Sequence, residues 1–237
     1  MFNEAISRGR SPATRAHILR TAIDLFRLRG LEATTMREIA SASGVALGAA
    51  YYYFASKEAI IQAYYDEVQA EHVRRLTASL AEGRPDLKRR LQIAFHAKLD
   101  ILQGDRKLLA ALFRFTAEPE HPLSPLGPST RLVRQLSVEA LSMAIGEERL
   151  PEDIRRILPT ALWVLQMGIL LYFIYDKSEE QKRTRRLIDG AITLLVRVLA
   201  LAKLAVLKPV RGSVLALLQE AELLPDPIPT ATHNVEE

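Results

Sequence analysis

The sequence predicts an all-α fold, and three observations support this prediction. Leu, Ala, Arg and Glu, which favour helices, are abundant, whereas glycine is sparse at 11 of 237 residues. Apolar residues recur three and four positions apart, and the alternation of Val, Ile and Thr that is typical of strands is nearly absent. Proline and glycine divide the periodic stretches into segments of helix length.

The first expected helix begins at Pro12 or Ala13 and ends at Arg29, where Gly30 follows as a C-terminal stop. Its inward face consists of residues at helical spacing, namely Ile18, Ala22, Leu25 and Phe26. Residues 1–11, which precede this helix, are polar and basic, and we expect them to form a flexible basic arm.

Residues 35–54 have the pattern of two short helices joined by a tight turn. Thr35 suits the N-cap of the first helix, with Glu38 as its capping-box partner, and Gly44 suits the turn. The second helix begins at 46 or 47 and ends at 53. The residues expected to hold the pair together are Ile39, Ala40, Val45 and Ala50. Small residues at the start of the second helix and tyrosines at its end are typical of a helix-turn-helix that reads DNA.

Beyond this motif the chain continues as a series of helices. Ser56 is the expected N-cap of the first, and Ser178, with Gln181 as its capping-box partner, is the expected N-cap of the last long one. The expected helices span residues 57–82, 86–103, 105–117, 129–145, 151–175, 178–207 and 213–223. Residues 118–128 hold prolines and a glycine and are expected to form a loop.

The expected elements divide the chain into four parts. These are the basic arm (1–11), a three-helix domain that carries the helix-turn-helix (12–58), a larger helical domain (59–224) and a proline-rich tail expected to be disordered (225–237). Residues 8–57 contain eight basic and three acidic residues, which gives +5, so the rest of the chain carries 4 − 5 = −1. The excess positive charge therefore lies on the motif, which favours binding to nucleic acid.

Composition also bears on where the protein works. The chain has no cysteine, which excludes disulfides, thiolate zinc sites and cysteine nucleophiles. Residues 1–15 lack the apolar segment of a signal peptide, so we expect a cytoplasmic protein. The uncharged stretch 157–175 is long enough to cross a bilayer, but Pro159 and Gln166 interrupt it. We expect it to be a core or interface helix, and the protein not to contact a membrane.

Residues 13–65 resemble the N-terminal domain of the TetR family of transcriptional regulators. The resemblance rests on residue types that agree in order over about fifty positions. The matching runs are the first helix up to Gly30, Thr35 to Ala40, Gly44-Val45, and Tyr51 to Glu58. Residues 66–237 match in architecture alone. The resemblance implies a ligand-responsive repressor that acts as a homodimer, with its two recognition helices in successive major grooves of a palindromic operator in double-stranded DNA.

The resemblance also implies which residues contact DNA. The candidates are Thr35, Arg37, Ala46, Leu47, Gly48, Ala49, Tyr51, Tyr52 and Lys57. At the start of its helix, Thr35 offers a hydroxyl and a backbone N–H to a phosphate. Gly48 permits close approach of the backbone, and Tyr51 and Tyr52 match family positions that contact phosphates or bases. Tyr53 and Phe54 are expected to belong to the core instead.

Two candidates depart from the family pattern. Ala46 stands where a Ser or Thr cap is common, and Leu47 where a polar or basic residue is common. The recognition helix therefore offers few hydrogen-bonding groups to base edges, although Leu47 and Ala49 suit contacts with thymine methyls. We expect specificity to rest on Arg37, the tyrosines, the basic arm and DNA shape.

In the family the second domain holds a ligand cavity and the dimer interface. The resemblance implies a homodimer through helices 151–175 and 178–207, whose apolar content exceeds the needs of one subunit's core. Candidates for the cavity are Phe95, His96, Phe113, Arg114, Met143, Trp163, Gln166 and Tyr172, each of which also suits a core or interface position. They predict a hydrophobic small-molecule effector, for which the loop 118–128 is a candidate gate.

Nothing in the sequence predicts an enzyme, a cofactor or a bound metal. The five histidines are scattered singly, and the chain lacks a glycine-rich phosphate loop, a Gly-x-Ser-x-Gly motif and a cluster of metal ligands. Two alternatives to a repressor stay open. One is a transcriptional activator on the same scaffold, and the other is a helical ligand-binding or membrane-associated protein whose helix-turn-helix is only a packing unit.

Overall fold

The computed structural model describes residues 11–204 and 208–220, and every regular element in these ranges is a helix. The α-helices are α2 (Pro12–Arg29), α3 (Met36–Ala42), α4 (Leu47–Tyr53), α5 (Lys57–Ala81), α6 (Leu87–Leu102), α7 (Arg106–Phe113), α8 (Arg131–Ile145), α9 (Glu152–Tyr175), α10 (Lys182–Ala202) and α11 (Lys208–Glu220). Short 3-10 turns are η2 (Gln103–Asp105), η3 (Arg114–Ala117), η4 (Pro128–Thr130) and η5 (Glu179–Gln181). The predicted all-α fold is confirmed. The predicted tail and all of the predicted arm except Ser11 lie outside the described residues.

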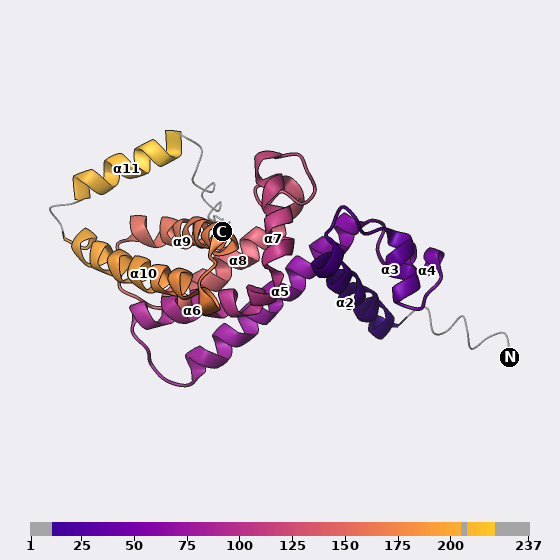
Figure 1. The fold of residues 1–237 in the computed structure, drawn as a ribbon. Coiled ribbons are helices and arrows are strands. Elements are labelled where there is room, and N and C mark those ends of the chain that lie inside the picture. Colours follow the sequence, from indigo (N-terminus) through magenta and orange to yellow (C-terminus); the bar gives the residue numbers. More distant parts are fainter. Residues whose placement is uncertain (1–10, 205–207, 221–237) are drawn as a thin grey trace, which may run out of the picture.

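Helices α2, α3 and α4 form a small head at one end of the molecule, and α5 leads from the head into the larger helical body (Figure 1). The head has its own core because apolar residues three or four positions apart face inward from each helix. This core includes Ile18, Leu19 and Phe26 from α2, Ile39 from α3, Ala50 and Phe54 from α4 and its end, and Ile60 and Ile61 from α5.

Local hydrogen bonds fix the ends of the head helices as the sequence predicts. The Thr35 hydroxyl accepts from the backbone N–H of Glu38 at 3.2 Å, and the Glu38 carboxylate accepts from the backbone N–H of Thr35 at 2.8 Å, which completes a capping box. Ser56 caps α5 in the predicted manner. Gly44, at φ 65°, makes the turn between α3 and α4 in a conformation that other residues rarely adopt.

The body is a layered bundle in which α5 packs against α6 and α8, α6 against α10, and α8 against α9. Helix α7 crosses from the body toward the head, contacting α9 on one side and α2 on the other. The predicted helix 105–117 is α-helical only from Arg106 to Phe113, because residues 114–117 form the 3-10 turn η3. The predicted helix 129–145 likewise begins with the turn η4 before α8.

The corner between α9 and α10 is held by a buried aspartate that the sequence analysis did not select. Asp176 accepts hydrogen bonds from the backbone N–H and hydroxyl of Ser178, at 2.9 and 2.6 Å, and from those of Thr184, at 2.9 and 2.7 Å. The predicted capping box of Ser178 and Gln181 is wrong, because the Gln181 backbone lies in the left-handed region. The Ser178 hydroxyl does cap α10, since it accepts from the Arg183 backbone N–H at 3.1 Å, and Asp176 caps it beside Ser178 through Thr184.

The C-terminal part of the chain also departs from the prediction. Helix α10 ends at Ala202 rather than at 207. The last helix begins at Lys208 rather than at 213. Pro209 lies in its first turn, where proline is tolerated because a backbone N–H would have no partner within the helix. Arg211 joins α11 to the start of α9 through an ion pair with Asp153, with Nε and Oδ2 2.8 Å apart.

Among the described residues, α9 is the one helix long and apolar enough to cross a membrane by length and composition. Its inner face packs in the core through Leu162, Trp163 and Phe173, and Pro159 and the buried Gln166 interrupt its apolar surface. These contacts are those of a core helix in a helical bundle, as the sequence analysis expects for this segment.

Asp176→Asn is expected to lower the free energy of unfolding by about 1–3 kcal/mol near neutral pH, because the amide turns a donor toward donors that the carboxylate accepts. Burial works against ionisation of Asp176, but the hydrogen bonds from Ser178 and Thr184 outweigh it and lower its pKa. The stabilisation should therefore be complete above the ordinary aspartate pKa of about 4 and disappear as the pH falls through the lowered value. Urea unfolding across a pH series measures this.

The matched control is Glu179→Gln, which removes an exposed carboxylate from the same connection. It should change the unfolding free energy by no more than about 0.5 kcal/mol. Equal stability of Asp176→Asn and the unchanged protein at neutral pH would contradict the capping role.

Candidate DNA-binding surface and ligand cavity

Helix α4 presents the residues that the sequence analysis selected for DNA contact. Leu47, Gly48, Tyr51 and Tyr52 are exposed, and the side chain of Tyr52 has 68% of its surface open to solvent. Ala50, on the opposite side of the helix, is fully buried against the head core. Ala46 is exposed and Ala49 is half-buried. The helix therefore presents small residues followed by two exposed tyrosines. It lies at the outer end of the head (Figure 1).

Arg37 projects from α3 into solvent, and it pairs with no acidic residue in the described part of the chain. Its neighbour Glu38 is engaged with Thr35 and, at 3.1 Å, with Arg29. Hydrogen bonds from Thr35 are the main reason that the pKa of Glu38 is lowered. Arg37 therefore keeps all of its guanidinium donors available for a partner outside the subunit.

Two other candidates use their donors inside the head. The Thr35 backbone N–H and hydroxyl both donate to the Glu38 carboxylate, at 2.8 and 2.9 Å. The Lys57 ammonium donates to the Leu31 carbonyl at 2.7 Å. A phosphate contact at Thr35 or Lys57 would have to compete with these bonds. Sequence alone could not show this for Lys57, because Leu31 lies 26 positions earlier in the chain.

The expected core positions behave as predicted. Phe54 is buried, and the guanidinium of Arg15 lies over its ring, 4.8 Å from the centroid. Tyr53 is half-buried and packs against the core, with its ring edge-on to Tyr52 at 5.2 Å between centroids. The end of α4 is thus anchored to α2, which fixes the direction in which the exposed tyrosines point.

The head is joined to the body through one buried carboxylate. Asp105, in η2, accepts from Arg27 Nε of α2 at 2.5 Å and from the Tyr64 hydroxyl of α5 at 2.7 Å. Burial and the nearby carboxylate raise the pKa of Tyr64, so its hydroxyl remains a donor. A second, exposed link between head and body is the ion pair of Arg114 with Glu32 at 3.0 Å.

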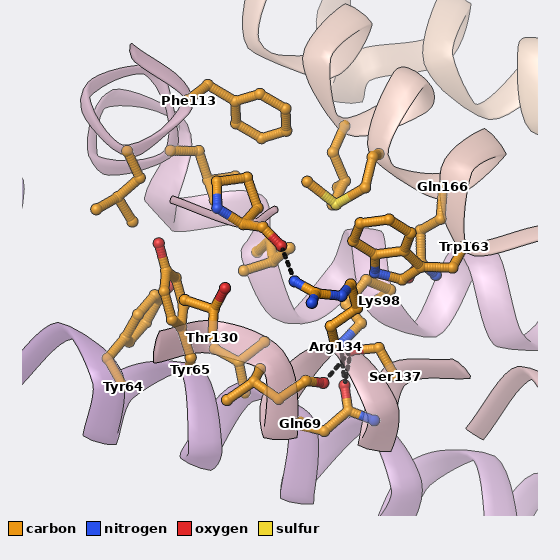
Figure 2. Close-up of a pocket in the computed structure, with 18 residues that line it drawn as sticks. Tyr64, Tyr65, Gln69, Lys98, Phe113, Thr130, Arg134, Ser137, Trp163 and Gln166 are labelled. Carbon is orange, nitrogen blue, oxygen red and sulfur yellow. Dashed lines mark hydrogen bonds between the residues drawn. The ribbon is translucent and has the colours of Figure 1, made fainter. Parts of the chain in front are cut away.

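The body contains a cavity of about 120 Å³, which is room for an organic group rather than for a single water. Helices α5, α6, α7, α8 and α9 all contribute to it, and Pro125 contributes from the predicted loop 118–128 (Figure 2). Tyr64, whose hydroxyl binds Asp105, is part of the cavity wall. The cavity wall and the connection to the head therefore share a side chain.

Three of the eight predicted cavity residues line this space, namely Phe113, Trp163 and Gln166. The other five lie elsewhere. Phe95 is buried in the core, and Met143 and Tyr172 are exposed on the surface. Arg114 binds Glu32, and His96 Nε2 lies 3.1 Å from an Asp189 oxygen on α10.

Apart from Gln166, the polar residues of the cavity wall were not among the predicted cavity residues. Gln69, Lys98, Arg134 and Ser137 line it, and they come from α5, α6 and α8. One residue of the polar wall could have been identified from the sequence. Lys98 follows Leu91 by seven positions and Phe95 by three, so it lies on the apolar face of α6, where a lysine is unusual.

No group of three or more His, Asp or Glu side chains within residues 11–204 and 208–220 has the arrangement of a metal site. The buried histidine, His72, is bonded to the Ala94 carbonyl at 2.8 Å, and burial lowers its pKa to about 3, so it is neutral.

Comparison with known proteins agrees with this division into head and body. Residues 18–64 match the model of the bacterial regulatory proteins of the TetR family, and residues 90–214 match that of the tetracyclin repressor-like C-terminal domain. The second match alone spans more than half of the chain. The chain therefore belongs to the TetR family of DNA-binding transcriptional regulators.

Relatives in this family include repressors. The chain is 34% identical over 112 residues to the HTH-type transcriptional repressor KstR2 of Rhodococcus jostii, a match that covers 43% of this chain and 54% of the relative. It is 29% identical over 149 residues to KstR2 of Mycobacterium tuberculosis, covering 59% and 70%. The match thus spans only about half the length of the Rhodococcus repressor.

Solved structures share the fold. The TetR transcriptional regulator from Nitrosomonas europaea superimposes with a TM-score of 0.63 at 20% identity, over 78% of this chain and 98% of that one. At this identity the likeness is one of architecture, and it extends through both the head and the body.

Asp105→Asn is expected to lower the free energy of unfolding by about 1–3 kcal/mol, because the amide keeps the shape of the side chain but loses the charge that Arg27 pairs with. Urea unfolding followed by circular dichroism measures the change. Asp24→Asn is the matched control, since Asp24 is the exposed partner of the same arginine at 2.9 Å. It should cost less than about 0.5 kcal/mol. Equal losses in the two variants would contradict the importance of the buried link.

Proposed function

We propose that this protein is a transcriptional repressor that binds a palindromic operator in double-stranded DNA as a homodimer and releases it when a small molecule enters the body cavity. The observation that carries the proposal is the free outer surface of the head. Gly48, Tyr51 and Tyr52 on α4 and Arg37 on α3 are exposed and keep donors available for a partner. Family membership and the repressors among the relatives support the same function.

The exposed groups suit a particular way of reading DNA. The first turn of α4 is small and apolar, so it can enter a major groove closely and meet thymine methyls, but it presents few donors to base edges. Arg37 and the hydroxyls of Tyr51 and Tyr52 supply hydrogen bonds to phosphates or bases. Specificity would then come from Arg37, from these contacts and from sequence-dependent groove shape.

Dimerisation is supported by the outer surfaces of α9 and α10, which lie side by side in the body. Apolar residues exposed there are Val164, Leu171, Tyr172 and Tyr175 on α9 and Leu187, Leu194, Val198 and Leu201 on α10. So many apolar side chains along two adjacent helices favour contact with a second copy. A two-fold axis through this surface would pair the heads with the two halves of a palindrome.

Release of DNA would use the carboxylate that joins head and body. A ligand in the cavity contacts the wall that includes Tyr64, and Tyr64 shares Asp105 with Arg27 of α2. Ligand binding that favours a different position of α7 would shift the head and thereby the population that fits both half-sites. Asp105→Asn should reduce the change in operator affinity that a cavity ligand produces, whereas Asp24→Asn should leave that change intact.

The effector is a small molecule with a hydrophobic body, because most of the residues that line the cavity are apolar or aromatic. We assign the protein no enzymatic activity, no cofactor and no membrane contact, and we place it in the cytoplasm with the DNA that it regulates.

Combined substitution Arg37→Ala and Tyr51→Ala is expected to lower operator affinity by about tenfold or more, because each lost contact is worth about 1–3 kcal/mol. Fluorescence anisotropy with a palindromic fragment from next to the protein's own gene measures the affinity over a series of salt concentrations. Loss of a phosphate contact would reduce the salt slope by about one, and loss of a base contact would relax sequence preference.

The control for this measurement is Arg89→Ala, which removes an exposed arginine from α6 in the body. It should bind the operator as the unchanged protein does. Full-strength binding by the double variant would remove Arg37 and Tyr51 from the assigned DNA-binding surface.

Leu194→Arg is expected to convert the dimer to a monomer, because a buried guanidinium without a partner cannot be accommodated in an apolar interface. Leu194 has 64% of its surface exposed in the single subunit. Sedimentation velocity measures the oligomeric state, and operator affinity should fall at least about tenfold since one head alone holds one half-site. Leu132→Arg, at an equally exposed leucine on α8, should remain dimeric. A dimeric Leu194→Arg protein would place the interface elsewhere.

A further inference from the structure

One side of the cavity has more hydrogen-bond donors than acceptors. Gln69 Oε1 accepts from both the Lys98 ammonium and the Ser137 hydroxyl, each at 2.9 Å, and the Gln69 amide nitrogen donates to the Leu136 carbonyl at 3.0 Å. Lys98 is buried, with 5% of its surface exposed, and this shared amide oxygen is its partner within the described residues. An ammonium has three N–H groups, so two remain without an acceptor (Figure 2).

A second donor in the same wall also lacks a partner. The side chain of Gln166 has 4% of its surface exposed, and its amide nitrogen has no hydrogen-bond partner within the described residues. Arg134 donates to the carbonyls of Pro125 and Gly127 rather than to a carboxylate. Neither aspartate nor glutamate is among the residues that line the cavity. The wall therefore supplies buried donors and positive charge for which residues 11–204 and 208–220 provide no counter-ion.

This arrangement is costly without a ligand. A buried ammonium needs an anion or several acceptors to offset the hydration that it loses. Burial lowers the pKa of Lys98 to about 7, so the ammonium persists in part near neutral pH even without a counter-ion. The other titratable groups nearby do not supply one: His72 is neutral, and burial raises the pKa of the Tyr64 and Tyr65 hydroxyls, so both remain uncharged.

The rest of the wall defines what else the ligand must carry. Apolar side chains surround the polar groups, among them Leu102, Leu112, Phe113, Val133 and Leu170. In Figure 2 the labelled residues Gln69, Lys98, Arg134, Ser137 and Gln166 lie toward one side of the view and Phe113 lies toward the other. The cavity is thus suited to a molecule with one acceptor-rich end and an apolar remainder.

We propose that the effector of this regulator is an amphipathic carboxylate, whose carboxylate binds Lys98 and the free amide N–H of Gln166 and whose apolar body lies against the Phe113 side of the cavity. This inference rests on the proposed ligand-responsive function and gives its effector a chemical class. A single carboxylate fits because Lys98 contributes one positive charge, while the Arg134 guanidinium already has backbone acceptors.

The experiment uses Trp163 as its reporter, since it is the single tryptophan of the chain and lines the cavity. Tryptophan fluorescence of the full-length protein is titrated near neutral pH with decanoate, phenylbutyrate and naphthylacetate, and with the methyl ester of each. At least one acid should bind more tightly than its ester by about tenfold to a hundredfold, the range expected for hydrogen bonds to a charged group. In Lys98→Met the acid should lose this preference and the ester should bind as before.

Two variants keep the test independent of folding. Lys107→Met removes an exposed lysine of α7 and should retain the preference for the acid. Gln166→Leu removes the second donor and should weaken binding of the acid without changing binding of the ester. It replaces Lys98→Met in the test if the thermal unfolding curve shows that Lys98→Met is not folded. The inference is overturned if no acid in the panel binds more tightly than its ester, or if Lys98→Met and Gln166→Leu keep the preference.

Operator binding without ligand is measured in the same proteins and separates this inference from the proposed function. The unchanged protein and Lys107→Met, whose substitution lies outside the cavity wall, should bind the operator with equal affinity. If acid binding requires Lys98 but the protein does not bind the operator, the proposed repressor function is wrong and the proposed ligand class stands. Intact operator binding without a preference for acids would remove the ligand class alone.

Discussion

The buried carboxylate of Asp105 is the constraint on which the relation between head and body depends. It accepts from Arg27 on α2 and from Tyr64 on α5, so one side chain fixes the head helix against both the long connecting helix and α7. Few other polar contacts join the two parts, and the pair of Arg114 with Glu32 is exposed and therefore weak. The Asp105 carboxylate is the route by which we propose that a ligand in the cavity affects the head.

Arg106, the residue after Asp105, connects the same corner of the chain to the end of α9. Arg106 donates to the carbonyls of Phe173, Ile174 and Asp176 at the end of α9, where helix geometry leaves backbone acceptors without partners. The Asp176 side chain in turn holds the start of α10. Consecutive residues at the corner between α6 and α7 therefore connect the head with the helices whose outer surface we assign to the dimer interface.

The cavity and the core of the body are made of the same helices, but the cavity wall contains a buried lysine and no aspartate or glutamate. In the core, His72 Nε2 lies 2.8 Å from the Ala94 carbonyl oxygen, whereas His72 Nδ1 has no hydrogen-bond partner among the described residues. In the cavity wall, Lys98 and Gln166 keep donors that nothing in the described chain accepts. Other buried polar atoms without partners, such as Ser43 Oγ, lie away from the cavity, so the feature particular to the cavity wall is a buried ammonium with no carboxylate beside it.

The sequence by itself determined the helices of the head, the helix-turn-helix and the exposed positions on α4. Those features depend on residues a few positions apart: the capping box of Thr35 and Glu38, the turn at Gly44, and the apolar spacing that buries Ala50. Local patterns of this kind are readable without a structure. The same patterns identified most helices of the body to within a few residues.

Only the tertiary structure decided which side chains share a space. Gln69, Lys98 and Gln166 come from three helices, and their meeting depends on how those helices pack rather than on any spacing along the chain. Packing likewise brings the Lys57 ammonium to the Leu31 carbonyl and Asp105 to Arg27, and it buries Phe95 in the core rather than in the cavity wall. Contacts between residues that are distant in the sequence form the cavity wall and its link to the head, because burial and charge pairing act through space and not along the sequence.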